Sequence, residues 1–424
     1  MKFSKYNVVK NDGISTWIFN TLTKAFVKLP AEIYNKIEEE DASGLRKELL
    51  KQGIFTDDAD EISLYKYKYY AHAFNPRIFH LCIAPTMQCN FSCFYCFEEG
   101  NKNLPTMSDE VENALIRYIE KNKEDQVSIN WFGGEPLLAF DRIVSISEKL
   151  NQKNIRFVSS LVTNGSLLTK SKIARLDGLH LTHIQISLDG LAPVHDRRRC
   201  FKNGKPSFDL ILSNIDSFIR NSSIPLHIQV AIDKTNSSAF HELLHLFNQN
   251  YPELVNKRIR IGCNFVQNRT EFDRCGVCFT TDDIFTKQVE SLKNGEKNDL
   301  TPSLPDLSLP CMYRCKKSFA IDPAGDMYKC LEYLGDPRFK VGNLLEGKIS
   351  PKKLAQATFS ESPFENDACT DCPVFPVCGG GCPIDRIKER NAPDKTYCSI
   401  HKTKLADMLP LLYAYAYSSQ TTSL

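Results

Sequence analysis

Residues 89–96 read CNFSCFYC and place Cys89, Cys93 and Cys96 in a CxxxCxxC arrangement. Three thiolates within a compact loop can hold one cubic [4Fe–4S] cluster and leave its fourth iron without a protein ligand. A small molecule can then chelate that iron. The spacing alone leaves two alternatives, a structural zinc site that lacks one ligand and thiols with no shared role.

The cysteine loop follows the first of six strand-like runs, which alternate with helix-like runs from about residue 78 to residue 300. Each strand-like run is rich in β-branched and aromatic residues and apolar nearly throughout, which indicates a strand covered on both faces. The predicted strands are 78–86, 126–133, 156–164, 183–190, 226–233 and 258–266. Amphipathic helices are predicted over 108–122, 140–154 and 208–221, the first with a start signal at Ser108.

Six such βα units predict an α/β fold, a partial (β/α)6 barrel of the TIM-like kind, with a doubly wound open sheet as the competitor. Chemistry in barrels collects where strands end and loops begin. Four predicted strands end in polar or glycine-rich sequences: PTMQCN (85–90), FGGEP (132–136), TNGS (163–166) and SLDG (187–190).

The CxxxCxxC loop, with the aromatic Tyr95 before its last cysteine, resembles the hallmark of the radical S-adenosylmethionine (SAM) superfamily. FGGEP resembles the family's glycine-rich segment at the methionyl amine of SAM, and TNG and SLDG end strands where the family also contacts SAM. The cofactor-binding residues that this resemblance implies are Tyr95, Gly133, Gly134, Glu135, Pro136, Asn164, Ser187, Asp189 and Arg199.

The resemblance also implies a mechanism. SAM would chelate the open iron, and one electron from the reduced cluster would cleave it to a 5′-deoxyadenosyl radical that abstracts hydrogen from a substrate. For two of these expected contacts the sequence allows an alternative without SAM. Glu135 could be a surface acid, and the basic run Arg197–Arg199 could be a solvated surface turn.

After residue 300, cysteine, glycine and proline replace regular periodicity, so metal ligation is expected to hold this segment together. Cys311 to Cys398 resembles the SPASM extension of the superfamily, with two auxiliary [4Fe–4S] clusters. Carried over by position, the nearer cluster takes Cys311, Cys315, Cys330 and Cys382, and the farther one takes Cys369, Cys372, Cys378 and Cys398. Two zinc sites are the alternative.

Five cysteines lie outside these sets. Cys82 and Cys263 fall in predicted strands and are expected to be small core residues, and Cys200 has no assigned role. Cys275 and Cys278 form an isolated CGVC, which is a weak candidate for a catalytic or redox pair.

Residues 1–75 are predicted to form a small α+β unit with two strands around a turn in 15–29, two short helices and a strand-like Ile54–Phe55. The pattern resembles the winged-helix, PqqD-like element with which peptide maturases capture a leader peptide as an added strand. A capping subdomain on the barrel is the alternative. The predicted domains are therefore 1–75, 76–300 for the barrel and 301–424 for the SPASM domain.

The bulk composition is that of a globular protein: 424 residues, 42% hydrophobic, 25% charged, net charge +2. It gives no reason to expect nucleic acid or a membrane as a partner. Neither a signal peptide nor a transmembrane span is visible, so a cytoplasmic location is expected, where 16 cysteines point to metal rather than disulfides.

The resemblance implies an oxidoreductase with a peptide or protein substrate and a low-potential electron donor of the flavodoxin or ferredoxin type. The leading hypothesis is a maturase that forms a thioether or carbon–carbon crosslink in a ribosomally made peptide. An anaerobic sulfatase maturase, which makes formylglycine, is one competitor, although FEEG (97–100) replaces its usual tyrosine-rich tail. An iron–sulfur electron-transfer or regulatory protein is the other.

Overall fold

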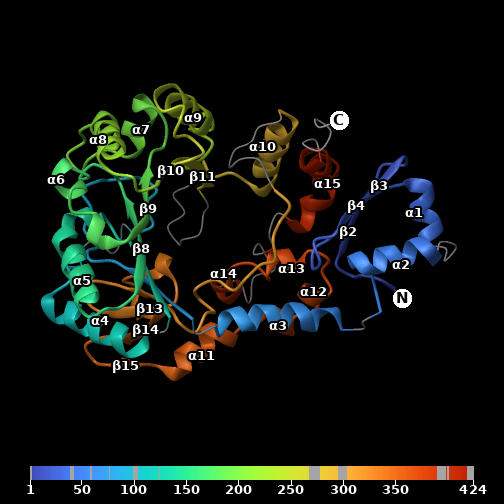
Figure 1. The fold of residues 1–424 in the computed structure, drawn as a ribbon, viewed down its shortest axis with the longest axis horizontal. Helices are drawn as coiled ribbons and strands as arrows, with labels where there is room; N and C mark the ends of the chain where they lie inside the picture. The colour runs from blue at the N-terminus through green and yellow to red at the C-terminus, as the bar shows by residue number, and fades with distance from the viewer. Residues whose placement is uncertain are drawn as a thin grey trace. The chain divides into compact units, whose positions relative to one another are not determined.

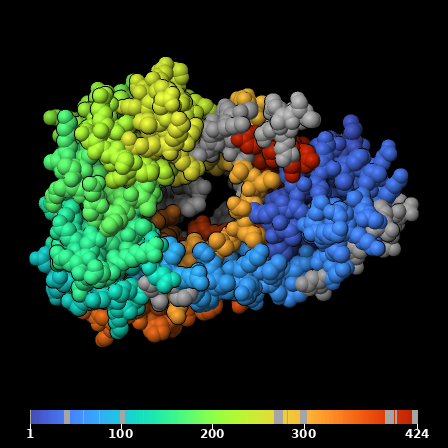
Figure 2. Space-filling model, in the orientation of Figure 1, coloured from blue at the N-terminus to red at the C-terminus, as the bar shows by residue number. Residues whose placement is uncertain are grey.

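The computed structural model describes residues 2–38, 43–57, 60–75, 77–98, 104–123, 125–266, 277–294, 303–388, 398 and 401–417; the others are grey in Figure 2. The chain divides into two compact units. The barrel unit comprises 75–280 and 312–358, and the terminal unit comprises 1–74, 281–311 and 359–424. These units cut across the three predicted domains, because the cysteine-rich segment contributes to both.

Six parallel strands form the main part of the sheet in the barrel unit, and all six were predicted. They are β6 (Ile78–Ile83), β7 (Gln126–Trp131), β8 (Phe157–Thr163), β9 (Leu181–Ser187), β10 (Leu226–Ile232) and β11 (Ile259–Phe265). Their order in the sheet follows their order in the chain, from β6 to β11. A doubly wound sheet reverses its strand order at a switch point, so the barrel-type winding is confirmed over its competitor.

Helices connect these strands and lie on one side of the sheet (Figure 1). They are α4 (Asp109–Asn122), α5 (Phe140–Gln152), α6 (Lys170–Ile173), α7 (Ala192–Arg198), α8 (Phe208–Asn221) and α9 (Ala239–Asn250). The predicted start of α4 is confirmed, because Ser108 accepts a hydrogen bond from the Val111 N–H at 3.3 Å. Among the described residues, no helix is long and apolar enough to cross a membrane.

Buried and half-buried residues alternate along most of these parallel strands, so the prediction that the strands are covered on both faces was wrong. Val127, Ile129 and Trp131 of β7 are buried, whereas the residues between them are half-buried and polar. The half-buried positions of β9 and β10 carry His183 and His227, whose rings stack with centroids 4.3 Å apart. One face of the sheet therefore packs under the helices, and the other presents polar side chains along the concave side.

Four short strands extend the sheet beyond β6, and the periodicity analysis missed them. β12 (Ser318–Ile321) pairs parallel with β6, and β13 (Asp326–Tyr328), β14 (Lys340–Asn343) and β15 (Lys348–Ile349) continue antiparallel. Two to four residues are too few for an alternation to register. Ala320, Tyr328 and Leu334 nevertheless share a buried core with β6, so this part does not depend on metal ligation alone.

The terminal unit begins with an antiparallel sheet in the order β2 (Asn7–Asn11), β3 (Ser15–Asn20), β4 (Phe26–Pro30). α1 (Ala31–Glu38) and α2 (Ser43–Gln52) follow; β5 (Phe55–Thr56) pairs with β1 (Lys2–Phe3), and α3 (Glu61–Ala73) comes next. The two predicted strands in 15–29, the two helices and the strand near residue 55 are confirmed. Neither β2 nor α3 was predicted.

The rest of the terminal unit, including its cysteine-rich part, is helical. Its helices are α10 (Thr281–Lys293), α12 (Asp367–Thr370), α13 (Phe375–Cys378), α14 (Pro383–Lys388) and α15 (His401–Tyr417). Trp17 and Phe19 of β3 share one buried cluster with Val374, Val377 and Leu409. The N-terminal sheet and the cysteine-rich segment thus form a single core, contrary to the expectation that the latter has little apolar packing.

A buried carboxylate links α4 to α5 and gives a stability prediction. Glu112 is fully buried and accepts from Ser145 Oγ at 2.6 Å and Lys149 Nζ at 2.6 Å, with Arg142 as a third partner. Because Glu112→Gln removes a buried charge that accepts from these donors, the free energy of unfolding should fall by about 1–3 kcal/mol. Thermal unfolding followed by circular dichroism under anaerobic conditions measures this change.

Glu110→Gln is the matched control, because Glu110 is an exposed acid in the same first turn of α4. Its loss should change stability by only about 0.5 kcal/mol. Equal losses in the two variants would contradict the assigned role of Glu112.

Candidate active site and metal centre

The loop that carries Cys89, Cys93 and Cys96 leaves β6 and is held by backbone pairing with residues far along the chain. Ser92 N–H donates to the Cys200 carbonyl at 3.0 Å, and Phe91 pairs with Phe201 in an antiparallel bridge. The three thiols are half-buried. Cys200, which had no predicted role, therefore contributes its backbone to the cysteine loop.

Tyr95 ties this loop to the end of β9. Its hydroxyl donates to Asp189 Oδ2 and accepts from Arg199 Nη1 at 2.6 Å. Burial disfavours the Arg199 charge, but the Cys93 thiolate, with Tyr95 and Asp189, outweighs burial and holds the pKa of Arg199 well above its ordinary value. Three predicted site residues, Tyr95, Asp189 and Arg199, thus meet beside Cys93.

Arg198 lies in the same place and was missed. The basic run was expected to be a solvated turn, but Arg198 is only 5% exposed and bonds Asp189 Oδ2 at 3.1 Å and Asp233 Oδ2 at 2.7 Å. Its guanidinium also lies over the rings of Phe94 and Tyr95, 5.1 and 5.2 Å from their centroids. The prediction of a solvated turn holds only for Arg197, which is exposed.

His195 contacts the backbone of Asp189. Its Nδ1 accepts from the Asp189 N–H at 3.2 Å, which leaves Nε2 to donate to Ser207 Oγ at 3.1 Å. Burial, with the nearby charges of Arg199 and Arg198, lowers the pKa of His195 to about 3, so the ring is neutral. No sequence signal marked His195, because an isolated histidine in a helix carries no motif.

Glu135 joins the ends of β7 and β8. Its carboxylate is fully buried and accepts from Leu137 N–H at 2.9 Å, Thr163 Oγ1 at 2.7 Å and Asn164 N–H at 2.7 Å. Burial raises the pKa of Glu135, and these hydrogen bonds oppose the rise. Glu135 is therefore not a surface acid, and its carboxylate accepts hydrogen bonds from groups of the protein itself.

The glycines of FGGEP were expected to lie against SAM, and the structure gives a further reason for them. Gly133 has φ +109°, and a Cβ there would lie 2.4 Å from the Thr86 carbonyl oxygen. A Cβ on Gly134 would lie 2.4 Å from the carbonyl oxygens of Met87 and Gln88. Glycine is thus required so that this loop can approach the backbone that leads into the cysteine loop.

The other predicted contacts lie at the same edge of the sheet. Asn164 Nδ2 donates to Asn90 Oδ1 at 2.8 Å, which connects the end of β8 to the cysteine loop. Ser187 is half-buried at the end of β9, and Pro136 is buried at the start of a 3₁₀ turn. The structure therefore brings together the predicted site residues of the barrel.

A bound polar group fits this edge. Among the described residues, the buried atoms Asp189 Oδ1 and Arg199 Nε have no hydrogen-bond partner. Within the same ranges, no three His, Cys, Asp or Glu side chains gather closely enough to hold a single metal ion.

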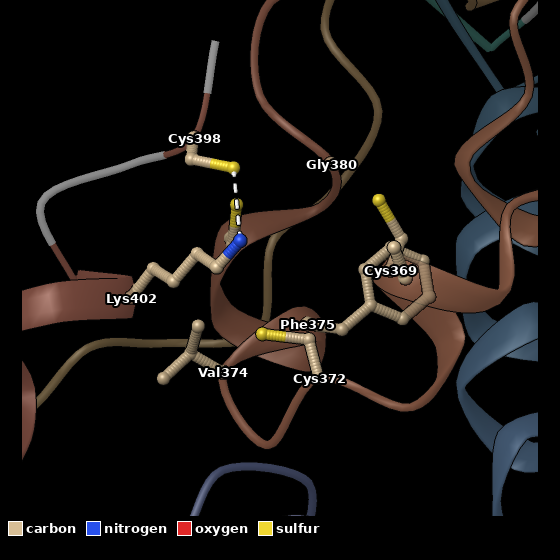
Figure 3. Close-up of a pocket in the computed structure, with 9 residues that line it drawn as sticks. Cys369, Cys372, Val374, Phe375, Gly380, Cys398 and Lys402 are labelled. Atoms are coloured by element: carbon tan, nitrogen blue, oxygen red, sulfur yellow. Dashed lines mark hydrogen bonds between the residues drawn. The ribbon is translucent and has the colours of Figure 1, made fainter. Parts of the chain in front are cut away.

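A second group of thiols lines a small pocket in the terminal unit (Figure 3). Its cysteines are Cys369, Cys372, Cys378 and Cys398, the set predicted for the farther cluster. Val374 and Phe375 form apolar walls, and burial raises the pKa of the Cys372 thiol. Lys402 points toward Cys398, and their Nζ and Sγ atoms are 3.6 Å apart.

The remaining cysteines are placed as follows. Cys311 and Cys382 belong to the terminal unit, and Cys315 and Cys330 belong to the barrel unit, so the predicted nearer cluster stays a prediction. Cys275 lies outside the described residues, and a catalytic role for Cys275 and Cys278 also stays a prediction. Cys82 is buried in the core as expected, whereas Cys263 is half-buried.

Sequence comparison identifies relatives of known type. Residues 83–247, from β6 to α9, match the model of the radical SAM superfamily. The chain is 23% identical over 351 residues to the cysteine-type anaerobic sulfatase-maturating enzyme of Clostridium perfringens, covering 74% of this chain and 91% of the relative. It is also 23% identical to the serine-type enzyme of Klebsiella aerogenes, covering 73% and 80%.

Solved structures share the fold. The enzyme anSMEcpe with bound AdoMet superimposes with a TM-score of 0.60 at 20% identity, covering 81% of this chain and 98% of that chain. Streptococcus suis SuiB bound to its precursor peptide SuiA gives a TM-score of 0.57 at 17% identity, covering 94% and 99%.

The family match confirms several expectations together. Enzymes of the matched family use a [4Fe–4S] cluster and SAM for radical chemistry, as the resemblance implied, so an electron-transfer protein without SAM chemistry is not supported. The matched segment contains the cysteine loop and the ends of β7, β8 and β9, where the predicted site residues meet. On this evidence residues 83–247 form a radical SAM domain.

Proposed function

We propose that the protein is a maturase that forms a thioether or carbon–carbon crosslink in a ribosomally made peptide. The coverage by SuiB, whose structure holds a precursor peptide, carries this proposal. The 94% of this chain that it covers leaves a remainder smaller than residues 1–74, so the match includes part of that segment. The curated sulfatase-maturating relatives match only 73–74% of the chain.

The barrel unit supplies the radical site. When bound, the cluster and SAM supply a 5′-deoxyadenosyl radical that takes hydrogen from the peptide. Cys89, Cys93 and Cys96 hold the cluster, and Ser187 and the backbone of 133–136 line the SAM site. The side chains of Glu135, Asn164, Tyr95 and Asp189 position these loops.

Eight further thiols hold two auxiliary clusters. Cys369, Cys372, Cys378 and Cys398 hold one, and the pocket they line supports this assignment. Cys311, Cys315, Cys330 and Cys382 hold the other. A low-potential donor of the flavodoxin or ferredoxin type delivers electrons. Such clusters persist in a reducing compartment, which supports a cytoplasmic location.

The N-terminal sheet receives the leader peptide at β4. Asn20 N–H donates to the Ala25 carbonyl, and Ala31 N–H donates to the Ile14 carbonyl, so these are hydrogen-bonded pairs of the β3–β4 ladder. Hydrogen-bonded and non-hydrogen-bonded pairs alternate in an antiparallel ladder. Lys28 opposite Trp17 is therefore a non-hydrogen-bonded pair, and the Lys28 N–H points away from β3. β4 is an edge strand of the described sheet, which an added strand can extend.

Formylglycine formation is the second candidate, favoured by the 91% coverage of the Clostridium perfringens enzyme. The two reactions differ in the chemistry of their products, because formylglycine made from serine also forms by loss of two hydrogens and has the same mass change as a crosslink. A crosslink removes two hydrogens and makes the peptide cyclic, whereas formylglycine is an aldehyde that reacts with a hydrazine probe. Mass spectrometry of the peptide encoded beside the gene, with and without the probe, distinguishes them.

The metal content gives the first functional prediction. Anaerobically reconstituted protein should hold about twelve irons per chain, because eleven suitably placed cysteines suit three clusters of four. Replacing Cys89, Cys93 and Cys96 with Ala should leave about eight irons and abolish the formation of 5′-deoxyadenosine. Iron analysis and chromatography of the SAM products measure both. Retained SAM cleavage in the triple variant would refute the assignment of that loop.

Glu135→Gln tests the positioning role of the buried carboxylate. In the wild type, Thr163 Oγ1 and Asn164 N–H each donate to one carboxylate oxygen of Glu135. The Gln side chain replaces one of these oxygens with an NH2 group, which cannot accept, so the ends of β7 and β8 should separate. SAM affinity should fall about tenfold or more, with the iron content unchanged. Equilibrium dialysis with SAM measures the affinity, and exposed Glu148→Gln on α5 serves as the matched control. Unchanged SAM affinity in Glu135→Gln would show that the contacts of Glu135 are dispensable.

Lys28→Pro tests the leader site. Proline removes the outward N–H of β4 without removing a ladder hydrogen bond, so precursor affinity should fall about tenfold or more. SAM cleavage without peptide should persist. Lys28→Ala keeps the N–H and loses the same side chain, so it should bind the precursor nearly as well as the wild type. Fluorescence anisotropy of labelled precursor measures the affinity, and wild-type binding by Lys28→Pro would exclude β4 as the docking edge.

A further inference from the structure

Two cations flank the thiol pocket of the terminal unit, one at each of two cysteines. Lys402 Nζ lies 3.6 Å from Cys398 Sγ, and Arg386 Nη1 lies 3.5 Å from Cys369 Sγ. Figure 3 shows Cys398 and Cys369 on opposite sides of the pocket, with the Lys402 side chain reaching toward Cys398. The family resemblance predicted the thiols but neither cation.

Arg386 is held rigidly in this position. It is 4% exposed, its Nε donates to the Glu361 carbonyl at 3.1 Å, and its Nη1 also donates to the Gly380 carbonyl at 3.1 Å. In the sequence, Glu361 precedes the first three cysteines of the pocket and Gly380 follows them. The guanidinium is therefore part of the pocket's framework, with one N–H directed at a ligand sulfur.

Lys402 approaches from α15 and is exposed to solvent. Its ammonium group lies 3.6 Å from the Cys398 sulfur and therefore brings a positive charge to the thiol pocket.

The charge of a cluster determines what these cations do. A [4Fe–4S] cluster with four thiolates is an anion, and its negative charge increases by one when it accepts an electron. A nearby cation therefore stabilises the reduced form more than the oxidised form, and hydrogen bonds to the sulfurs act in the same direction. The apolar walls formed by Val374 and Phe375 reduce the screening of this attraction.

We propose that Arg386 and Lys402 raise the reduction potential of the auxiliary cluster held by Cys369, Cys372, Cys378 and Cys398, so that it readily accepts the electron of an external low-potential donor. The step is a one-electron reduction in which no bond forms or breaks. The inference rests on the proposed ligand set, and it adds the residues that set the electron affinity of this cluster.

The experiment is an anaerobic redox titration of the full-length, reconstituted holoenzyme with dithionite, followed by electron paramagnetic resonance. The signal of this cluster is identified by its loss in Cys372→Ser. Lys402→Met and Arg386→Met each remove one positive charge, and each should shift the midpoint potential of that signal to a more negative value. The double variant should shift it further, and Lys402→Arg, which keeps the charge, should stay near the wild type.

Lys404→Met is the matched control. Lys404 lies on the same helix two residues later, where its Nζ pairs with Asp282 at 2.7 Å and lies over the ring of Phe285. Its removal changes the net charge by the same amount without removing a cation at a thiol, so it should leave the potential unchanged. An equal shift in Lys404→Met and Lys402→Met would overturn the proposal, because net charge alone would then explain the effect.

Two results separate this inference from the proposed function. If Cys372→Ser keeps the full iron content and every signal, the cluster itself is wrongly placed, and both proposals fail. If the signal is lost in Cys372→Ser but Lys402→Met titrates like the wild type, only the role of the cations is refuted. Should Arg386→Met fail to retain iron, the surface variant Lys402→Met and the charge-keeping Arg386→Lys decide the question.

Discussion

The geometry of the radical site depends on one buried ion network. Arg198 lies between Asp189 and Asp233, both fully buried, and it also covers the rings of Phe94 and Tyr95 in the cysteine loop. Buried charges are tolerated only when they are paired, and removing one partner costs about 3–5 kcal/mol. The network therefore holds the cysteine loop against the ends of β9 and β10.

The same logic applies at the ends of β7 and β8. Glu135 gathers three donors from Leu137, Thr163 and Asn164, and Asn164 in turn bonds Asn90 of the cysteine loop. Each strand end is thus connected to the same loop by a buried polar contact. A site that must present several backbone segments to one cofactor is held in this way, because loops alone do not keep such positions.

The sequence predicted the parts of this arrangement that repeat or follow a motif. Strands β6 to β11 were found because each has six or seven residues of strand-forming type, and the cysteine loop because its spacing is distinctive. β12 to β15 were too short to register. Arg198 could not be recognised, because only the fold shows that one member of a basic run points inward. Gly133 and Gly134 were located correctly, but their neighbours proved to be backbone carbonyls of the chain itself.

The terminal unit shows why segments distant in sequence act together. Tyr6 and Tyr65, from the first part of the chain, pack with Phe375, which also lines the thiol pocket, while Trp17 and Phe19 pack with Val374 and Val377. Ligation of a cluster contributes folding free energy to the segment that supplies its thiols. Because that segment shares its core with β2, β3 and β4, the free energy also stabilises the N-terminal sheet. In the proposed maturase, the element that receives the leader peptide and the loop that holds the auxiliary cluster are therefore parts of one folding unit.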